Sequence, residues 1–337
     1  MIKKRWGDAI VKAWQMPELG DPWSGLRVVD IPSPKVHEQA VRVAVEATDL
    51  NFADILQCQG SYQVKVDAPF TPGMGTVGRV VEVPDGAELK VGQRIVGPTI
   101  AGAGGYAEEA LVLVEQATLV NDEVDPVAAV AMHVTYGTAW FGLHYRGNLR
   151  PGETVLVLAA AGGVGAAALE LAKLHGCWVI AAAGGSEKVQ TCRAMGADEV
   201  VDYESEDLYE RVMALTEGRG VDVIYDPVGG DYFDVARRLV AWEGRILIIG
   251  FASGTIPSAP LNHALVKNYS IVGVHMGGYR QKDPTPFKEC YDTLYDMLVQ
   301  DQIHPLVDRI VGFDDLPQAL LDLSERRSRG RIVFKPN

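Results

Sequence analysis

The stretch LVLAAAGGVGAAALELAK, residues 156–173, combines a glycine cluster with small and apolar side chains. Aligned on the dinucleotide-binding pattern GxGxxG, it places Ala160, Gly162 and Gly165 at the three glycine positions. Gly162 would let the backbone approach a pyrophosphate, Gly165 would let a helix pack close to a strand, and the helix amides after Val164 would bind the phosphates. A tight strand-to-helix turn is the alternative. The position between a strand and a helix favours the nucleotide site.

The end of the next strand, about 20 residues further on, indicates which dinucleotide is bound. Ala183 occupies the place where an acidic residue would hold the ribose hydroxyls of NAD, so that position offers no carboxylate to repel a 2′-phosphate. Donors follow instead: the amides of Gly184 and Gly185, the hydroxyl of Ser186 and the ammonium of Lys188. This pattern favours NADPH. The adjacent Glu187 weakens the inference, and Lys188 can also be read as an ordinary exposed helix residue.

The segments around these motifs alternate between apolar strands and helices over residues 154–274. Continuous apolar strands of five or six residues, separated by helices, are typical of a parallel sheet covered on both faces. We therefore expect an α/β fold, with a Rossmann-type doubly wound sheet over residues 126–290.

The first 120 residues have a different pattern, with short strands such as AVRVAVEA and VGRVVEV separated by Pro, Gly and Asp turns. This predicts a mostly antiparallel, barrel-like domain. The last segment contains a strand, a helix and a strand without partners of their own, so we expect it to return to the N-terminal domain. The predicted domains are residues 1–125 with 291–337, and residues 126–290.

The composition excludes several classes of function. A formal net charge of −13 argues against nucleic-acid and anionic-membrane surfaces, which need clustered Lys and Arg. Residues 156–173 are too polar for a membrane span, because glycines, Glu170 and Lys173 interrupt them. No apolar run follows the basic N-terminus, so we expect no signal peptide. Four cysteines without a CxxC pair fit a reducing compartment, and we expect a cytoplasmic protein.

Taken in order, six motifs resemble the medium-chain dehydrogenase/reductase superfamily, in its zinc-independent quinone oxidoreductase branch, over nearly the whole chain. They are NFADILQCQGSY (51–62), PGMGTVGRVVEV (72–83), VTYGTAW (134–140), RPGETVLVLAAAGGVG (150–165), YDPVGG (225–230) and GFASGTIPSAPLNHALVKNYSIVGV (250–274). The resemblance implies a GroES-like catalytic domain beside the Rossmann domain, and a homodimer built through the nucleotide domain, with the edge of YSIVGV as the expected contact.

The zinc ligands of the related alcohol dehydrogenases are absent from their places. Asn51 stands where the ligating Cys would be, and Met74 and Gly75 replace the His-Glu pair. The histidines do not pair at metal-ligand spacing, so we expect no metal.

Without a Lewis acid, the natural acceptors are conjugated, because their developing charge is delocalised and hydrogen-bond donors suffice. We therefore expect an NADPH-dependent reductase of small-molecule quinones. The alternatives are an enoyl reductase acting on an activated C=C bond of an acyl thioester, enone or acrylate, and a non-catalytic NADPH-binding protein.

The resemblance places Asn51 and Tyr62 in the substrate cleft as candidate catalytic residues, and Thr138 beside the nicotinamide. Asn51 could donate a hydrogen bond to the substrate oxygen, or only cap a helix that starts near Phe52. Tyr62 could donate a hydrogen bond or a proton, or only wall the cleft.

Further candidates lie at the ends of the predicted strands. Tyr203 could stack near the adenosine or be an ordinary strand-end tyrosine, and ligands of open α/β sheets bind at the carboxyl ends of the strands. The full set of expected cofactor-binding residues is Thr138, Ala160, Gly162, Gly163, Val164, Gly165, Gly184, Ser186, Lys188, Tyr203, Val228, Gly250, Phe251 and Ala252.

Overall fold

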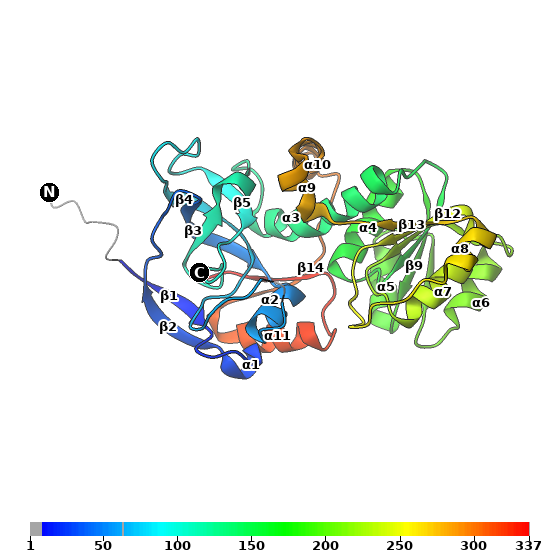
Figure 1. Ribbon diagram of the computed structural model, residues 1–337, viewed down its shortest axis with the longest axis horizontal. Helices are drawn as coiled ribbons and strands as arrows, with labels where there is room; N and C mark the ends of the chain where they lie inside the picture. Colours follow the sequence, from blue (N-terminus) through cyan, green and yellow to red (C-terminus); the bar gives the residue numbers. More distant parts are fainter. Residues whose placement is uncertain (1–8, 63, 337) are drawn as a thin grey trace. The chain divides into compact units, whose positions relative to one another are not determined.

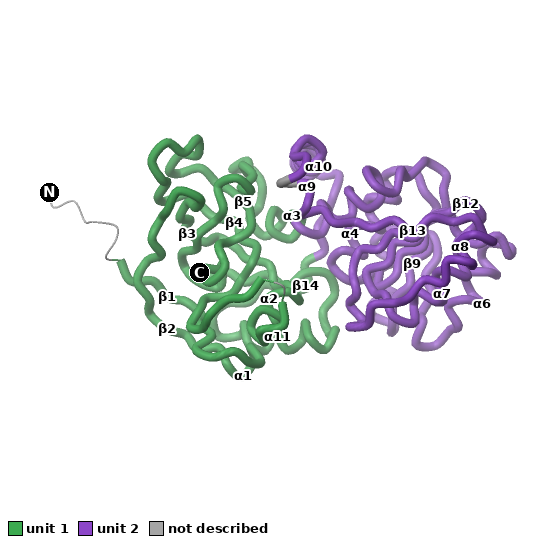
Figure 2. Tube along the Cα trace, viewed as in Figure 1, with its two compact units in different colours: residues 1–133, 307–337 green, residues 134–306 purple. Residues whose placement is uncertain are grey.

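The computed structural model describes residues 9–62 and 64–336, without the side chains of residues 280 and 281 (Figure 1). The chain forms two compact units (Figure 2). The first unit holds the chain up to His133 and again from Val307, and the second unit holds Val134–Leu306. Both boundaries lie later in the chain than the expected 125/126 and 290/291.

Apolar runs form the six parallel strands of the sheet in the second unit, in the order β10-β9-β8-β11-β12-β13. The strands are β8 (Thr154–Leu158), β9 (Trp178–Ala183), β10 (Glu199–Asp202), β11 (Val221–Asp226), β12 (Val240–Ile248) and β13 (Ser270–Gly273). All five residues of β8 are buried, as expected for a central strand covered on both faces. The predicted doubly wound sheet is confirmed.

Five helices connect these strands: α4 (Gly163–Leu174), α5 (Ser186–Ala194), α6 (Leu208–Leu215), α7 (Asp231–Leu239) and α8 (Leu261–Lys267). From β8 the chain moves to β9 and β10, then returns past β8 to β11. Right-handed crossovers therefore place α4 and α5 on one face and the other three helices on the opposite face. The strand order reverses between β8 and β11, and ligands of such sheets bind outside the carboxyl ends of the strands at this point.

The first unit is built around a sheet in the order β14-β15-β3-β4-β5-β7, with β6 also paired to β3. These strands are β3 (Ala40–Asp49), β4 (Gly75–Glu82), β5 (Arg94–Pro98), β6 (Glu109–Leu113), β7 (Thr118–Leu119), β14 (Val307–Val311) and β15 (Arg331–Phe334). All pairs except β14–β15 are antiparallel. A separate hairpin pairs β1 (Ile10–Gln15) with β2 (Arg27–Pro32). The predicted mostly antiparallel, GroES-like domain is confirmed.

The helices of the first unit are α1 (Pro22–Gly25), α2 (Phe52–Cys58) and α11 (Leu316–Ser324). Helix α3 (Pro126–Trp140) contains the boundary between the units and continues as a π-helical turn over Phe141–Arg146. Helices α9 (Met276–Lys282) and α10 (Pro284–Val299) complete the second unit.

None of the helices within the described residues is long and apolar enough to cross a membrane. The first eight residues, which carry part of the signal-peptide argument, lie outside the described residues.

Candidate functional site

The glycine-rich loop joins β8 to α4, as the sequence predicts. Gly162 is the N-cap of α4, whose first residues are Gly163, Val164 and Gly165. A Cβ atom on Gly165 would lie 2.3 Å from the carbonyl oxygen of Ala159, so only glycine fits there. A Cβ atom on Gly162 would lie 3.2 Å from the same oxygen, a milder conflict.

The loop is fixed by its own backbone. Ala159 has a φ of 50°, and Ala160, the residue in the place of the first glycine, is fully buried and donates its N–H to Ala182 O at 3.0 Å. The first amides of α4 have no acceptor within the helix, and they carry the positive end of its dipole. The residues present therefore fit a dinucleotide pyrophosphate.

The loop after β9 carries the residues expected to select the cofactor. Gly184 is buried, Gly185 has a φ of 84°, and Ser186 begins α5. Lys188 is half-buried in the first turn of that helix. The N–H of Gly185 donates to Asp202 Oδ1 at 2.9 Å, and this bond, with one from the N–H of Glu204, lowers the pKa of Asp202.

The structure corrects one premise of the cofactor argument. A carboxylate does lie at this loop, because the turn after β10 brings Glu204 against Gly184: a Cβ atom on Gly184 would lie 2.7 Å from Glu204 Oε1. The sequence argument considered only the end of β9, whereas Glu204 follows β10 and is therefore distant from Gly184 in sequence. The positive side chain of Lys188 and the negative side chain of Glu204 therefore both belong to the surroundings of the loop.

Tyr203 lies at the same loop. A Cβ atom on Gly184 would come within 2.6 Å of its ring, and the ring meets Tyr232 edge-on with centroids 5.5 Å apart. The expected position at the adenosine end of a dinucleotide stays a prediction.

The loops after β11 and β12 form one hydrogen-bonded layer at the carboxyl edge of the sheet. The N–H of Ala252 donates to Pro227 O at 3.0 Å, and that of Ser253 donates to Val228 O at 3.0 Å. Gly250 is half-buried, and Phe251 and Ala252 are exposed. The buried Asp226 supports this layer, because its Oδ1 accepts the N–H groups of Val228 and Gly229; burial raises its pKa.

Thr138 lies in the part of α3 that belongs to the second unit, and it is half-buried. Its hydroxyl donates to Val134 O at 2.7 Å. Oγ1 therefore has lone pairs left to accept a hydrogen bond from a ligand, while its proton is already used.

In the first unit, Asn51 is the N-cap of α2, as the capping interpretation expected. Its backbone N–H donates to Asp54 Oδ2 at 2.8 Å, which is one half of a capping box. Asp54 is fully buried and also accepts the N–H of Met74 at 2.9 Å and the hydroxyl of Tyr106 at 2.8 Å. Burial raises the pKa of Asp54 to about 6, against the lowering effect of these hydrogen bonds.

The side chain of Asn51 is held by two partners. Its Oδ1 accepts from Arg331, and its Nδ2 donates to Asp49 O at 3.3 Å. Tyr62 is half-buried, and its backbone N–H donates to Leu56 O at 3.1 Å. The two candidate catalytic residues thus flank the opposite ends of α2, a seven-residue helix about 10 Å long.

The residues at the former ligand positions do not fit a catalytic zinc. Asn51 Oδ1 is occupied by a guanidinium, and Met74 and Gly75 replace the His-Glu pair. A Cβ atom on Gly75 would lie 2.8 Å from Asp49 Oδ1, so the Asp49 carboxylate fills the space that a side chain there would need. Within the described residues, no three His, Cys, Asp or Glu side chains form a metal-binding group.

Asp49, Asp54, Tyr106 and Arg331 are the polar residues around Asn51 that sequence reasoning missed. The three-residue spacing of Asn51 and Asp54 is a local signal for a capping box. Nothing local indicates Arg331.

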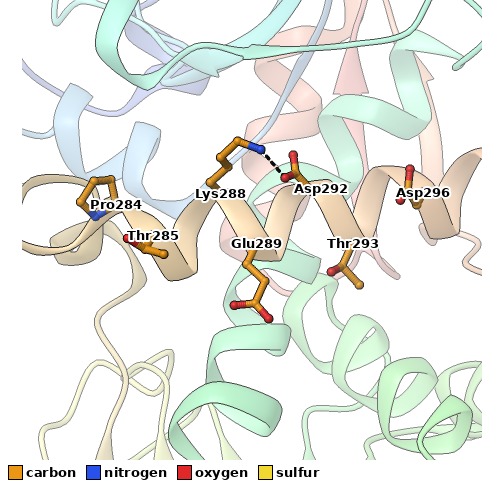
Figure 3. A pocket seen from close by; sticks show the side chains of 7 residues that line it. All are labelled: Pro284, Thr285, Lys288, Glu289, Asp292, Thr293 and Asp296. Carbon is orange, nitrogen blue, oxygen red and sulfur yellow. Dashed lines mark hydrogen bonds and ion pairs between the residues drawn. The ribbon is translucent and has the colours of Figure 1, made fainter.

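A hollow of about 550 Å³ lies elsewhere, along α10, and none of the predicted site residues lines it (Figure 3).

The comparisons with known proteins agree with the fold of the two units. Residues 37–122 match the alcohol dehydrogenase GroES-like domain, and residues 163–294 match the family described as zinc-binding dehydrogenase. The chain is 39% identical over 310 residues to quinone oxidoreductase-like protein 2 of Bos taurus, covering 91% of this chain and 88% of the relative.

Two solved structures are similar over their whole length. A quinone oxidoreductase of Pseudomonas syringae pv. Tomato DC3000 is 30% identical, with a TM-score of 0.86 and coverage of 97% of this chain and 100% of that one. A mycobacterial protein solved in complex with NADPH is 28% identical, with a TM-score of 0.87 and the same coverage.

Proposed function

Since this chain belongs to the medium-chain dehydrogenase/reductase superfamily, as a quinone oxidoreductase-like enzyme, we propose that it reduces quinones with NADPH as the hydride donor. The observation that carries the proposal is the polar cluster around Asn51. Where the related alcohol dehydrogenases have a metal ligand, this chain has a carboxamide whose oxygen accepts from Arg331 and whose NH₂ group can donate.

The second unit supplies the dinucleotide site in this proposal. The α4 amides bind the pyrophosphate, Ser186 and Lys188 bind the 2′-phosphate, and the loops after β11 and β12 border the nicotinamide half. The NADPH complex of the mycobacterial relative supports this assignment. A bound dihydronicotinamide supplies a hydride, and one further proton completes the two-electron reduction of the quinone.

The first unit supplies the polar groups for the acceptor. Asn51 donates a hydrogen bond to the acceptor oxygen, where negative charge develops, and Tyr62 is the second donor. A quinone spreads that charge over a conjugated ring, so neutral donors suffice without a metal. A simple ketone localises the charge on one oxygen, and we expect it to react slowly.

The experiment is the initial rate of NADPH oxidation in the presence of a chelator, with a quinone and an enoyl thioester compared side by side and NADH as the second donor. Faster quinone turnover with NADPH supports the proposal. Faster enoyl turnover moves the substrate to an activated C=C bond. Binding of NADPH with no turnover of either acceptor contradicts an enzymatic role.

We further propose that the chain forms a homodimer through the second unit. Leu261, Leu265 and Val266 of α8 are 77%, 81% and 75% exposed. Within the described residues, the edge strand β13 pairs only with β12, and its Ile271 is 39% exposed. An exposed apolar helix, followed in the chain by an edge strand, favours a second copy of the same surface related by a two-fold axis.

A further inference from the structure

We propose that Arg331 is a positioning residue, which fixes the direction of the Asn51 carboxamide so that its NH₂ group faces the acceptor. The inference rests on the proposed function, because it concerns how Asn51 acts on an acceptor oxygen. Arg331 and Asn51 lie 280 residues apart in sequence and within one unit of the structure.

Strand register brings the two residues together. In the antiparallel pair of β15 and β3, Val333 lies opposite Asp49, and Phe334 lies opposite Thr48. The N–H of Leu50 continues the pattern by donating to Ile332 O at 3.0 Å. One step further along this register, Arg331 stands opposite Asn51. The buried Ile332 and Phe334 anchor the strand in the core, so the alternation of the strand fixes the face on which Arg331 lies.

The contacts determine which end of the amide faces which partner. A guanidinium can only donate, so the atom of Asn51 that meets Arg331 must be the oxygen. A carbonyl oxygen can only accept, so the atom that meets Asp49 O must be the nitrogen. In a flipped amide the NH₂ group would face the guanidinium of Arg331, donor against donor, and the oxygen would face Asp49 O, acceptor against acceptor. Asn51 is therefore a hydrogen-bond donor toward any acceptor, with one N–H of its NH₂ group still available.

The charge of Arg331 is held in place by Asp49. The guanidinium donates to Asp49 Oδ2, and the two side chains are 12% and 1% exposed. A buried ion pair of this kind is costly to break from one side, so Arg331 has a fixed position. Its positive charge at Asn51 Oδ1 also polarises the amide, which strengthens donation by the NH₂ group in the same chain of hydrogen bonds.

The test is a double-mutant cycle on quinone turnover, with Asn51→Ala, Arg331→Met and the combined variant. Loss of the Asn51 donor lowers kcat by about 100-fold. Arg331→Met lowers kcat by about tenfold when Asn51 is present, and changes kcat by less than about twofold when Asn51 is already Ala, because Arg331 acts through it. The Kd of NADPH, a property of the second unit, stays unchanged.

Three further variants separate positioning from folding. Arg331→Lys keeps a donor and a counter-charge for Asp49, and recovers part of kcat. Asp49→Asn combined with Arg331→Met leaves no buried unpaired charge, so we expect the thermal midpoint to be restored. We expect kcat to stay lowered, because Asn51 still lacks the guanidinium. Arg327→Met removes an exposed arginine of the same unit, paired with Asp322 and Glu325, and leaves kcat unchanged.

The outcomes are distinct. An equal loss of kcat from Arg331→Met in both Asn51 backgrounds, or no loss at all, overturns the positioning role while the proposed function stands. A wild-type enzyme that turns over neither quinone nor enoyl thioester overturns the proposed function and the inference together.

Discussion

The hydroxyl of Tyr106 donates a hydrogen bond of 2.8 Å to Asp54 Oδ2, in a part of the first unit where both side chains are fully buried. Together with the N–H groups of Asn51 and Met74, which donate to the same carboxylate, this bond joins the start of α2, the backbone of Met74 and the segment before β6. The backbone of the candidate donor Asn51 is thereby positioned by a buried acid.

Asp54 makes stability depend on pH. Burial raises its pKa from the ordinary 3.8 to about 6 in the folded protein, so between these values the native state binds a proton more tightly than the unfolded chain does. The stabilisation that protonated Asp54 contributes is therefore complete below about pH 4. It is lost as pH rises to about 6, and the loss lowers the free energy of unfolding by about 3 kcal/mol.

The measurement is urea unfolding of wild type and Asp54→Asn at pH 4.5 and pH 7. We expect the stability difference between the two proteins to shift in favour of the variant at the higher pH. Tyr106→Phe removes a bond that lowers the pKa of Asp54, so the window should move upward. A difference that is constant with pH would rule out the titration.

Gly165→Ala should weaken dinucleotide binding. The new methyl group would lie 2.3 Å from Ala159 O, and relieving the overlap displaces the loop at a cost of about 1–3 kcal/mol. We expect a lower thermal midpoint and a Kd for NADPH raised at least about tenfold. Gly162→Ala should show a smaller effect, and Gly20→Ala, which meets no atom within 4 Å, should show none. Equal binding by all three variants would contradict the assigned loop geometry.

Lys188→Met tests the 2′-phosphate contact. Loss of a charge-assisted hydrogen bond should raise the KM for NADPH by about tenfold and leave the KM for NADH unchanged. The matched control is Lys288→Met, because Lys288 lies on α10 and pairs with Asp292 away from the candidate loop (Figure 3). If both cofactors lose affinity equally, Lys188 has only a structural role.

Glu204→Gln should move cofactor preference in the opposite direction. The carboxylate beside Gly184 would repel a phosphate bound in that loop, and removing a surface charge at this range is worth about 1 kcal/mol. We expect the NADPH-to-NADH ratio of kcat/KM to rise about fivefold. Glu210→Gln, on the exposed side of α6, should leave the ratio as it is. An unchanged or lower ratio in Glu204→Gln would show that Glu204 does not disfavour the 2′-phosphate.

Leu265→Glu tests the homodimer. A charge on the exposed face of α8 should shift the mass measured by light scattering from dimer to monomer at micromolar concentration. The reason is that dimerisation would bury the new carboxylate in an apolar contact, which costs its hydration energy. Val91 is 63% exposed in the first unit, and Val91→Glu is the matched control, expected to remain dimeric. A monomeric wild type would refute the interface.

The features that the sequence predicts well are local ones. The β8–α4 loop has its three key positions within six residues, and the strands of the second unit follow one another along the chain. Asn51 and its helix are also local, since the cap and the first turn are adjacent.

The features that sequence reasoning missed depend on pairing between distant segments. Glu204 reaches Gly184 only because β10 lies beside β9, and Arg331 reaches Asn51 only through the β15–β3 register. Asp49 looks like an ordinary strand residue until the last strand brings a guanidinium to it. Register between strands far apart in sequence cannot be derived from periodicity, which indicates only the face of a residue.

The order of strands in the first unit has a consequence for synthesis on the ribosome. All six strands of the second unit lie between residues 154 and 273, so its sheet can be completed before β14 and β15 are made. The barrel-like unit must wait for its final two strands, although its other strands are made first. Domains generally fold as units during synthesis. The glycine-rich loop can therefore form while Asn51 still lacks Arg331, and the surroundings of Asn51 are completed last.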